Sequence, residues 1–267
     1  MSESKVTAPG LLEMKERGEK ITCLTAYDYP TVTLLEQAGI DVVLVGDSVG
    51  NVILGYDNTL PVTMEEMLHH TKPVAFGAER ALVVADMPYL SYQISPEQAV
   101  ENAGRFLKEG GAEAVKLEGG EEMAETVRRI AEVGIPVMGH VGYTPQSVHT
   151  FGSHKVRGKD EDSAQLVLDG AEALQNAGVF AIILESMPAA LARQVTENLT
   201  VPTIGIGAGP HCDGQVLIFH DMLGLYPGHI AKFVKQYAQL GDAATEAIKQ
   251  YIAEVRSGEF PGAEHSY

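Results

Sequence analysis

The chain repeats one short design five times: a run of apolar, β-forming residues that ends at an ionisable side chain. Apolar runs without alternation are typical of strands buried on both faces, as in a parallel sheet. The carboxyl ends of parallel strands lie along one edge, where α/β proteins build their sites. We therefore expect a single functional rim that gathers the residues ending these runs, namely Asp47, Asp86, Glu118, His140 and Glu185.

Helical patterns separate the runs, and the alternation continues along the chain. Eight strands alternating with helices predict a parallel (β/α)8 barrel, or TIM barrel, and 267 residues match the usual length of one such domain. A doubly wound open sheet is the alternative, although its polar strand ends would gather at one switch point. The expected strands are residues 21–28, 42–47, 81–86, 114–118, 136–141, 181–185, 202–209 with a glycine-rich turn, and 216–221.

Further helices are expected at both ends of the barrel. Residues 9–17 carry apolar side chains on one side and could cap the bottom of the barrel as an N-terminal helix. Residues 231–240 and 242–256 are expected to form extra C-terminal helices. Because no linker-like stretch interrupts the pattern, we expect one domain over residues 1–267.

The composition narrows the classes of partner. A net charge of −17 argues against nucleic acid, because phosphate binding needs basic patches. No apolar run approaches the roughly 18 residues of a membrane span, and the first residues lack the apolar core of a signal peptide. The two cysteines, Cys23 and Cys212, are far apart and fit a reduced compartment. We expect a cytoplasmic protein without a membrane or nucleic-acid partner.

Three of the expected strand ends are carboxylates in succession: Asp47, Asp86 and Glu118. Clustered carboxylates repel one another unless a cation lies between them, and Mg²⁺ accepts such oxygen ligands together with water. A helix cap is the alternative role for any single one of them. Lys116, two residues before Glu118, should point the same way into the barrel, where it needs an anionic partner.

Glu185 is expected across the barrel from this group. Its apolar surroundings would raise the pKa of the carboxyl group and suit it to proton abstraction near neutral pH, with a structural ion pair as the alternative. His140 could bind an oxyanion or a substrate carboxylate, or could equally be a structural histidine. Ser48 is placed to donate a hydrogen bond to a ligand.

Two motifs and one loop allow more than one interpretation of their function. Residues 46–50 match the G-x-S-x-G of serine hydrolases, but that motif must lead straight into a helix, and a loop is expected from residue 51. Residues 205–209 resemble a dinucleotide loop, but Pro210 stands where the third glycine is needed. Close approach of a ligand to the backbone is the better interpretation. Cations of the loop over residues 142–159 could meet an anionic ligand or be merely solvated: His154, Lys155, Arg157 and Lys159.

Many short motifs, in the same order along nearly the whole chain, resemble the ketopantoate hydroxymethyltransferase family, that is, the 3-methyl-2-oxobutanoate hydroxymethyltransferases. The matching stretches are residues 25–28, 45–48, 85–88, 115–120, 139–142, 144–146, 184–185, 204–209, 220–221, 260–262 and 265–266.

The resemblance implies a (β/α)8 barrel that transfers a one-carbon unit from 5,10-methylenetetrahydrofolate to 3-methyl-2-oxobutanoate, giving 2-dehydropantoate for pantothenate synthesis. It implies Mg²⁺ at Asp47, Asp86 and Glu118, and Glu185 as the proton acceptor. It also implies a homodecamer. The keto-acid contacts that it implies are Asp47, Ser48, Asp86 and Lys116.

Three rival functions remain open from the sequence. A phosphonomutase or isocitrate-lyase-type enzyme shares the scaffold, but its Lys-Lys-Cys-Gly-His loop is missing, since no cysteine lies between Cys23 and Cys212. A catalytically silent barrel that binds keto acids is the second, against which an intact base at Glu185 argues. The serine hydrolase is the third.

Overall fold

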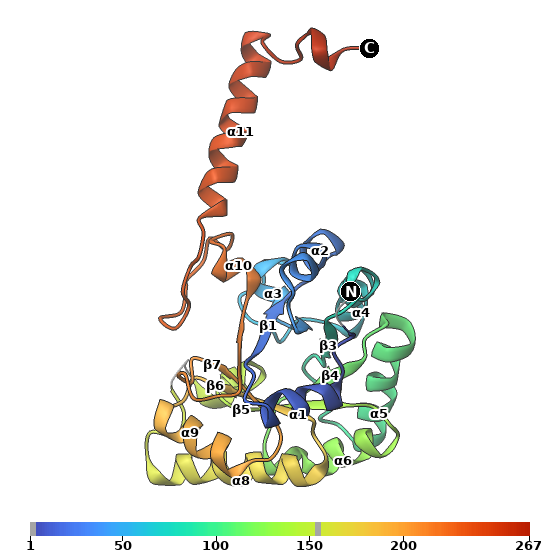
Figure 1. The fold of residues 1–267 in the computed structure, drawn as a ribbon, viewed down its shortest axis with the longest axis vertical. Coiled ribbons are helices and arrows are strands. Elements are labelled where there is room, and N and C mark those ends of the chain that lie inside the picture. The colour runs from blue at the N-terminus through green and yellow to red at the C-terminus, as the bar shows by residue number, and fades with distance from the viewer. Residues whose placement is uncertain (1–3, 153–155) are drawn as a thin grey trace. The chain divides into compact units, whose positions relative to one another are not determined.

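The computed structural model describes residues 4–152 and 156–267. Eight parallel strands close into a barrel in their sequence order (Figure 1). Closure confirms the predicted (β/α)8 fold and excludes the open sheet. The strands are β1 (Ile21–Thr25), β2 (Val42–Val45), β3 (Leu82–Asp86), β4 (Ala114–Lys116), β5 (Val137–Gly142), β6 (Ala181–Glu185), β7 (Thr203–Ile206) and β8 (Gly214–Leu217).

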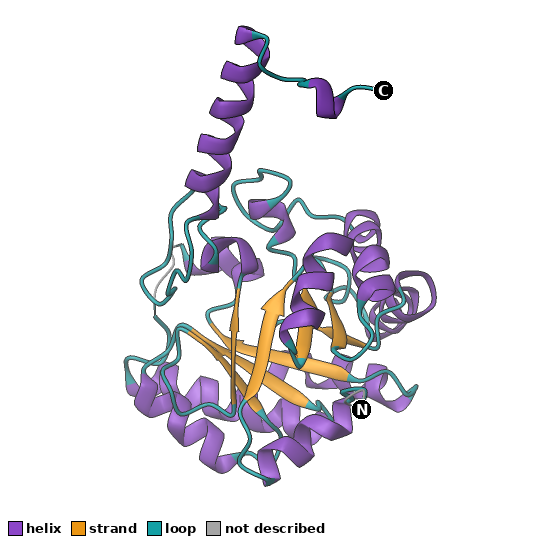
Figure 2. Ribbon diagram, turned by 45° about the horizontal axis from the view of Figure 1, so that its top comes forward, coloured by secondary structure: helices purple, strands orange, loops and turns teal. Residues whose placement is uncertain are grey.

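Helices lie around the outside of the strands, as Figure 2 shows in purple against the orange barrel. The α-helices of this part of the chain are α1 (Ala8–Glu16), α2 (Tyr29–Ala38), α3 (Val49–Val52), α4 (Met64–Gly77), α5 (Pro96–Arg105), α6 (Ala124–Glu132), α7 (Val148–Phe151), α8 (Glu161–Ala177) and α9 (Ala189–Asn198). Three short turns of 3-10 or π-helix accompany them: η1 (Phe106–Gly110), η2 (Glu121–Met123) and η3 (Pro145–Ser147).

Local sequence signals explain where these helices begin and end. Thr63 and Glu66, three residues apart, have the spacing of a capping box in the sequence, and they form one at the start of α4. The Thr63 hydroxyl accepts from the Glu66 N–H, and Glu66 Oε2 accepts from the Thr63 N–H. Asp160 caps α8, and Gly178 ends it in the left-handed conformation.

The N-terminal helix α1 closes the end of the barrel opposite to the carboxyl ends of the strands. Leu11 is fully buried and packs with the core residues inside the barrel. Lys15 Nζ donates to the carbonyl oxygens of Leu199 and Val201, which precede β7, and pairs with Asp213 at 3.0 Å. The predicted capping helix is therefore confirmed, with its bounds shifted by one residue.

The last strand lies earlier than expected. Residues 216–221 were predicted as a strand, whereas β8 begins at Gly214 and α10 (Phe219–Met222) takes the rest. Gly214 pairs with Ile21 of β1, and a Cβ on it would lie 2.5 Å from the Ile21 carbonyl oxygen. A glycine and a glutamine do not resemble a strand start in the sequence, which explains the error.

One of the two predicted C-terminal helices is wrong. Residues 231–239 form no helix, and α11 (Leu240–Ser257) follows them, with η4 (Ala263–His265) near the end. The backbone N–H of Tyr237 donates to Met222, and that of Leu240 donates to Leu223. These backbone groups thus bond to the last residue of α10 and to the residue after it, rather than within a helix of their own.

The contacts within the chain define two compact units, one up to Ile218 and one over Phe219–Tyr267. The first holds the barrel, and the second holds α10, α11 and η4. The expectation of one domain over residues 1–267 stays a prediction. In the described part of the chain, none of the helices combines the length and the apolar character needed to traverse a membrane.

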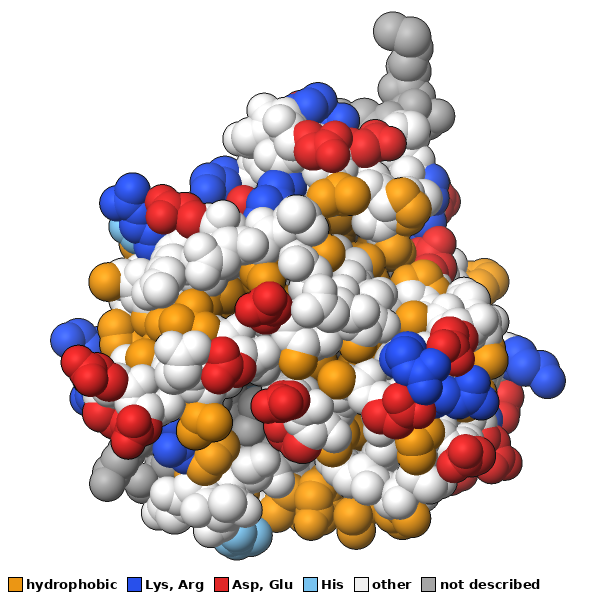
Figure 3. Space-filling model, turned by 90° about the horizontal axis from the view of Figure 1, so that it is seen from below, with side chains coloured by type: hydrophobic (Ala, Val, Ile, Leu, Met, Phe, Trp, Pro, Cys, Tyr) orange, Lys and Arg blue, Asp and Glu red, His pale blue; other side chains and the backbone are white. Residues whose placement is uncertain are grey.

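Charged side chains on the outside pair mainly with neighbours on their own helix. Arg128 contacts Glu125 and Glu132 on α6, and Arg193 contacts Glu197 on α9. Figure 3 shows one face of the molecule, where red acidic and blue basic groups are interspersed with hydrophobic ones. Exposed pairs of this kind contribute about 0–1 kcal/mol each, so the fold depends on the apolar core instead.

Replacing Leu11 tests the contribution of the capping helix. Leu11→Ala should lower the free energy of unfolding by about 2–5 kcal/mol, because a fully buried leucine leaves a cavity. The neighbouring Leu12 is 37% exposed, so Leu12→Ala should stay within about 0.5 kcal/mol of wild type. Urea unfolding measures both, and equal losses would contradict the packing of α1 into the barrel.

Candidate active site

Alternation along four strands carries ionisable side chains into the mouth of the barrel. Side chains two residues apart in a strand share a face. The interior core contains one residue two positions before each of these groups, namely Val84, Ala114, Met138 and Ile183. The ionisable side chains that continue the same face, near the carboxyl ends of β3 to β6, are Asp86, Lys116, His140 and Glu185.

Lys116 joins two of the carboxylates. The strand register places Asp86 of β3 beside Lys116 of β4. Lys116 Nζ lies 2.9 Å from each Asp86 oxygen and 3.7 Å from Glu118 Oε1, and the lysine is only 3% exposed. The strand predicted over residues 114–118 ends at Lys116, so Glu118 comes from the following loop rather than from β4. Lys116 points into the barrel as predicted.

Asp47 and Ser48 lie in the turn after β2. The backbone N–H of Asp47 donates to Asp86 Oδ2 over 3.2 Å, so the two aspartates are neighbours. The Ser48 hydroxyl lies 2.7 Å from that of Tyr27. The one-turn helix α3 runs from Val49 to Val52, with the N–H of Val52 bonded to the Ser48 carbonyl. The loop expected from residue 51 therefore begins later, and a short helix does follow Ser48 directly. Ser48 is nevertheless paired with a tyrosine, whereas a hydrolase nucleophile needs a base such as histidine.

His140 of β5 connects Glu118, in the loop after β4, with Glu185 on β6. Its Nε2 lies 3.2 Å from Glu185 Oε2, and its Nδ1 lies 3.6 Å from Glu118 Oε1. The imidazole is 2% exposed, and both contacts are ion pairs rather than hydrogen bonds. The structure therefore brings Glu185 into the same group of charges, although the sequence placed it apart. We call Asp47, Asp86, Lys116, Glu118, His140 and Glu185 the rim cluster.

Two further side chains belong to this cluster and were missed in the sequence. Gln146 donates its backbone N–H to Glu118 Oε2 and its side-chain amide to Asp47 Oδ2, each over 2.9 Å. The hydroxyl of Tyr92 donates to Gln146 Oε1 over 2.7 Å. Gln146 lies in the matched motif over residues 144–146, but a glutamine in a sequence does not by itself indicate a catalytic or metal-binding role. Tyr92 lies outside every motif.

Burial and mutual repulsion raise the pKa of the two aspartates. For Asp47 burial is the largest cause, followed by the charges of Asp86 and Glu118, and the pKa lies well above its ordinary value. Burial also raises the pKa of Asp86, against the opposing charge of Lys116. At Glu118 burial also acts to raise the pKa, but the contacts with His140 and Lys116 outweigh it, and the pKa is lowered.

The two cationic groups are held in their charged forms. Burial acts to lower the pKa of Lys116, but the charges of Asp86 and Glu118 outweigh it and the pKa is raised. Burial and Lys116 likewise favour neutral His140, yet its contacts with Glu118 and Glu185 raise the pKa of His140 to about 9. Both groups therefore carry protons at neutral pH.

The rim cluster has more acidic than basic groups, since four carboxyl groups stand against Lys116 and His140. Glu118 Oε1 is buried without a hydrogen-bond partner. Carboxylate oxygens and surplus negative charge fit a divalent cation such as Mg²⁺, which usually takes one or two carboxylates and completes its shell with water or substrate oxygens.

The described residues hold no group of three or more His, Cys, Asp or Glu side chains already placed around one metal position. Lys116 occupies both oxygens of Asp86, and Gln146 occupies one oxygen each of Asp47 and Glu118. The ligand set Asp47, Asp86 and Glu118 therefore stays a prediction.

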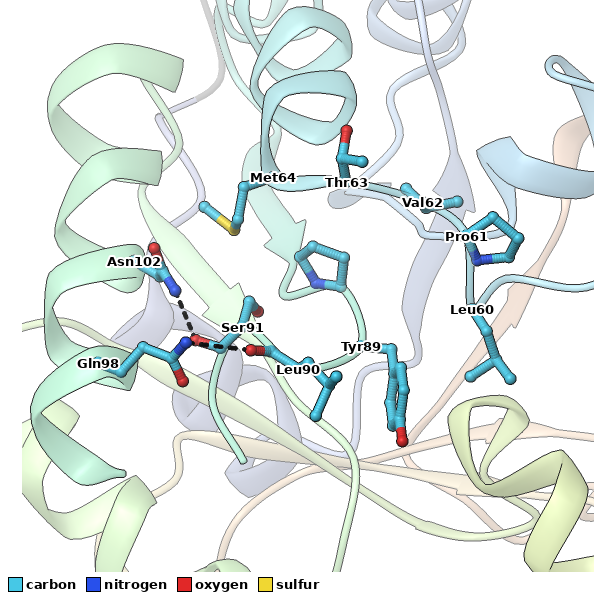
Figure 4. Close-up of a pocket in the computed structure, with 11 residues that line it drawn as sticks. Leu60, Pro61, Val62, Thr63, Met64, Tyr89, Leu90, Ser91, Gln98 and Asn102 are labelled. Atoms are coloured by element: carbon cyan, nitrogen blue, oxygen red, sulfur yellow. Dashed lines mark hydrogen bonds between the residues drawn. The ribbon is translucent and has the colours of Figure 1, made fainter. Parts of the chain in front are cut away.

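A cavity of about 600 Å³ lies among the segments that follow β3 and precede α4. Figure 4 shows its lining, which comes from residues 60–63 before α4, Met64 at its start, residues 88–91 after β3, and Gln98 and Asn102 of α5. The amides of Gln98 and Asn102 donate to the backbone oxygens of Leu90 and Ser91. The lining consists of apolar, hydroxyl and amide groups, and it includes none of the ionisable side chains of the rim cluster.

The remaining sequence features have structural explanations. A Cβ on Gly209 would lie 2.5 Å from Ala189 Cβ, so the chain's own packing requires this glycine. Arg157 lies over the Phe151 ring, 3.3 Å from its centre. His154 and Lys155, two of the cations predicted to meet an anionic ligand, lie outside the described residues.

Comparison with protein families gives one match over almost the whole chain. A family model described as ketopantoate hydroxymethyltransferase matches residues 5–263. A 3-methyl-2-oxobutanoate hydroxymethyltransferase of Carboxydothermus hydrogenoformans is 59% identical over 263 residues, which cover 98% of this chain and 95% of that protein. One from Moorella thermoacetica is 58% identical over 264 residues, which cover 99% and 98%.

Solved structures of other enzymes share the fold. A phosphonopyruvate hydrolase in complex with oxalate and Mg²⁺ is 13% identical with a TM-score of 0.64, covering 97% of this chain and 93% of that one. A 2,3-dimethylmalate lyase of the PEP mutase/isocitrate lyase superfamily is 17% identical with a TM-score of 0.62, covering 98% and 88%. At these identities the similarity concerns the fold alone.

The raised pKa of His140 predicts a pH-dependent stability. The folded pKa, about 9, lies above the ordinary value of 6.5, so the protonated ring stabilises the fold fully below about pH 6.5 and loses this contribution as the pH rises through 9. The loss should be on the order of 3 kcal/mol. In EDTA, wild type should therefore be more stable than His140→Gln by a wider margin at pH 6 than at pH 9.5. A margin independent of pH in thermal unfolding would contradict this.

Proposed function

The chain belongs to the ketopantoate hydroxymethyltransferase family, and we propose that it transfers a one-carbon unit from 5,10-methylenetetrahydrofolate to 3-methyl-2-oxobutanoate, with Mg²⁺ as cofactor and Glu185 as base. It is a hydroxymethyltransferase of pantothenate biosynthesis. The observation that supports the detailed reaction is the rim cluster, which holds a carboxylate base, an imidazole and an ammonium group in one buried group.

Asp47 and Asp86, with Glu118 beside them, would hold the Mg²⁺ ion. When bound, Mg²⁺ supplies Lewis acidity toward the oxygens of the keto acid and so favours loss of the C3 proton. Lys116 holds the Asp86 carboxylate from one side and fixes its direction. Because Lys116 remains charged, it also offers positive charge to a substrate carboxylate or oxyanion.

Glu185 is the group that we assign to proton removal. It ends β6 and is less buried than the other carboxyl groups, with a side-chain exposure of 16% against 2–3% for Asp86 and Glu118. The charged ring of His140 holds its carboxylate from the inner side. A carboxylate that is oriented yet still accessible can reach a carbon acid bound at the mouth of the barrel.

The remaining contacts would orient the keto acid. Ser48 lies beside Asp47 at the edge of the rim cluster, and its hydroxyl is already directed by Tyr27. His140 faces the same interior between Glu118 and Glu185, where it can also meet an oxygen of the substrate. Fixed donors of this kind hold the reacting carbon near its acceptor.

The bond changes follow from the substrates. Glu185 takes the C3 proton, and C3 then forms a bond to the methylene carbon of the folate. The bonds from that carbon to the two folate nitrogens break, and water supplies the hydroxyl group. The proton taken from C3 and the second hydrogen of the water go to those nitrogens, and tetrahydrofolate leaves. The product carries a new hydroxymethyl group on C3. We also expect the enzyme to work as a homo-oligomer, with the decamer as the assembly implied by the family.

Removing the base tests the assignment of Glu185. Glu185→Gln keeps the shape and should lower kcat for 2-dehydropantoate formation by about 10²–10⁴-fold, while calorimetry still detects binding of the keto acid. Glu197→Gln on the exposed face of α9 is the matched control and should retain full activity. Normal turnover in Glu185→Gln would remove this residue from the base role.

Removing one oxygen ligand tests the metal assignment. Asp86→Asn should weaken Mg²⁺ binding by at least about 10-fold in calorimetric titration, because a neutral amide replaces a buried carboxylate. Asp169→Asn on α8 should bind as wild type does, since Asp169 is exposed on the outer face of the helix, where its carboxylate accepts from Gln165. Thermal unfolding in EDTA checks that the variant folds, and an unchanged Mg²⁺ affinity in folded Asp86→Asn would contradict the assignment.

A further inference from the structure

Gln146, which follows β5, contacts the segments that follow three other strands, β2, β3 and β4. It lies in η3, just after β5, and is 6% exposed. Its side-chain amide donates to Asp47 Oδ2 after β2 and to the Met87 carbonyl after β3, each over 2.9 Å. Its backbone N–H donates to Glu118 Oε2 after β4, also over 2.9 Å. One residue thereby links the segments that carry the proposed metal ligands.

The amide of Gln146 has every hydrogen-bonding position in use, which fixes its orientation. The two N–H donors point to Asp47 and Met87, and the oxygen accepts from the Tyr92 hydroxyl at 2.7 Å and from Gln93 Nε2 at 3.2 Å. An amide has two donors and two acceptor positions, so all four are satisfied. A fully satisfied buried network is rigid and specifies a single arrangement.

Tyr92 sets the direction of this amide. Its ring is 1% exposed, and its hydroxyl oxygen accepts the backbone N–H of Glu118 over 3.1 Å. The hydroxyl proton has two acceptors within reach, and the contact with Gln146 Oε1 at 2.7 Å is shorter than that with the Glu118 carbonyl oxygen at 3.3 Å. A flipped Gln146 would set its oxygen against the Asp47 carboxylate, which excludes the other orientation.

Gln146 engages one oxygen on each of two carboxylates and makes no bond to the other. It holds Oδ2 of Asp47 and Oε2 of Glu118, whereas Oε1 of Glu118 is buried without a hydrogen-bond partner. A donor that fixes one carboxylate oxygen determines where the second one points. Partners that orient ligating groups in this way affect metal binding about 10–100-fold.

We propose that Gln146 is a positioning residue: with its amide oriented by Tyr92, it directs the second oxygens of Asp47 and Glu118 toward the Mg²⁺ position. This inference rests on the proposed function for the presence of the metal. A glutamate at position 146 could not replace it, since it would add a fifth carboxylate and lose the donor to Asp47.

Calorimetric titration of the full chain with Mg²⁺ tests the proposal. Gln146→Met keeps the length but removes the amide, and its dissociation constant for Mg²⁺ should rise about 10–100-fold. Tyr92→Phe should shift the constant in the same direction, because it keeps the ring and removes the orienting hydroxyl. Gln146→Asn should recover part of the affinity. Gln165→Met, the same change on the exposed face of α8, should bind as wild type does.

Steady-state kinetics provide the second readout. Gln146→Met should lower kcat at least about 10-fold with a smaller change in KM for the keto acid, and thermal unfolding in EDTA identifies any variant that has lost its fold. Wild-type Mg²⁺ affinity and wild-type kcat in folded Gln146→Met would overturn the proposal. If wild type itself bound no Mg²⁺, the metal assignment would fail, and an unchanged kcat in the variant would still overturn the positioning role.

Discussion

The buried ion pair between Lys116 and Asp86 is the interaction on which the candidate site depends. A charge taken out of water costs several kcal/mol unless it is paired, and four carboxyl groups lie together in the mouth of this barrel. Lys116 contacts Asp86 with both hydrogen bonds at 2.9 Å and approaches Glu118 at 3.7 Å. The register of β3 with β4 makes the pair possible, because it sets the two residues side by side.

The same strands therefore stabilise the barrel at their N-terminal ends and carry the candidate site at their carboxyl ends. Toward the N-terminal end, Leu82, Val84 and Ala114 fill the interior together with Leu11 of α1. Two residues further along the same faces, apolar side chains give way to Asp86 and Lys116. This division matches the general (β/α)8 barrel, in which active sites lie at the carboxyl ends of the strands. The exposed ion pairs on the outer helices contribute little to stability or to the candidate site.

The fold and the polar strand ends could be predicted because both follow from short-range patterns. Period-two alternation put Lys116 inside the barrel, and the capping box marked the start of α4. The failures depend on long-range contacts. The β8 pairing at Gly214 and the non-helical segment at residues 231–239 depend on partners distant in sequence or on backbone groups that no side chain reveals. Gln146 was missed for the same reason, since its contacts reach 28 to 99 residues away.

The central claim is that the rim cluster removes the C3 proton of the keto acid. Its most direct test is the exchange of that proton in deuterated water, followed by NMR on the wild-type protein with 3-methyl-2-oxobutanoate, with and without Mg²⁺. Without any folate, we expect exchange that depends on Mg²⁺, because proton removal precedes formation of the new carbon–carbon bond. The absence of exchange, even after tetrahydrofolate is added, would contradict the account and favour a barrel that only binds keto acids.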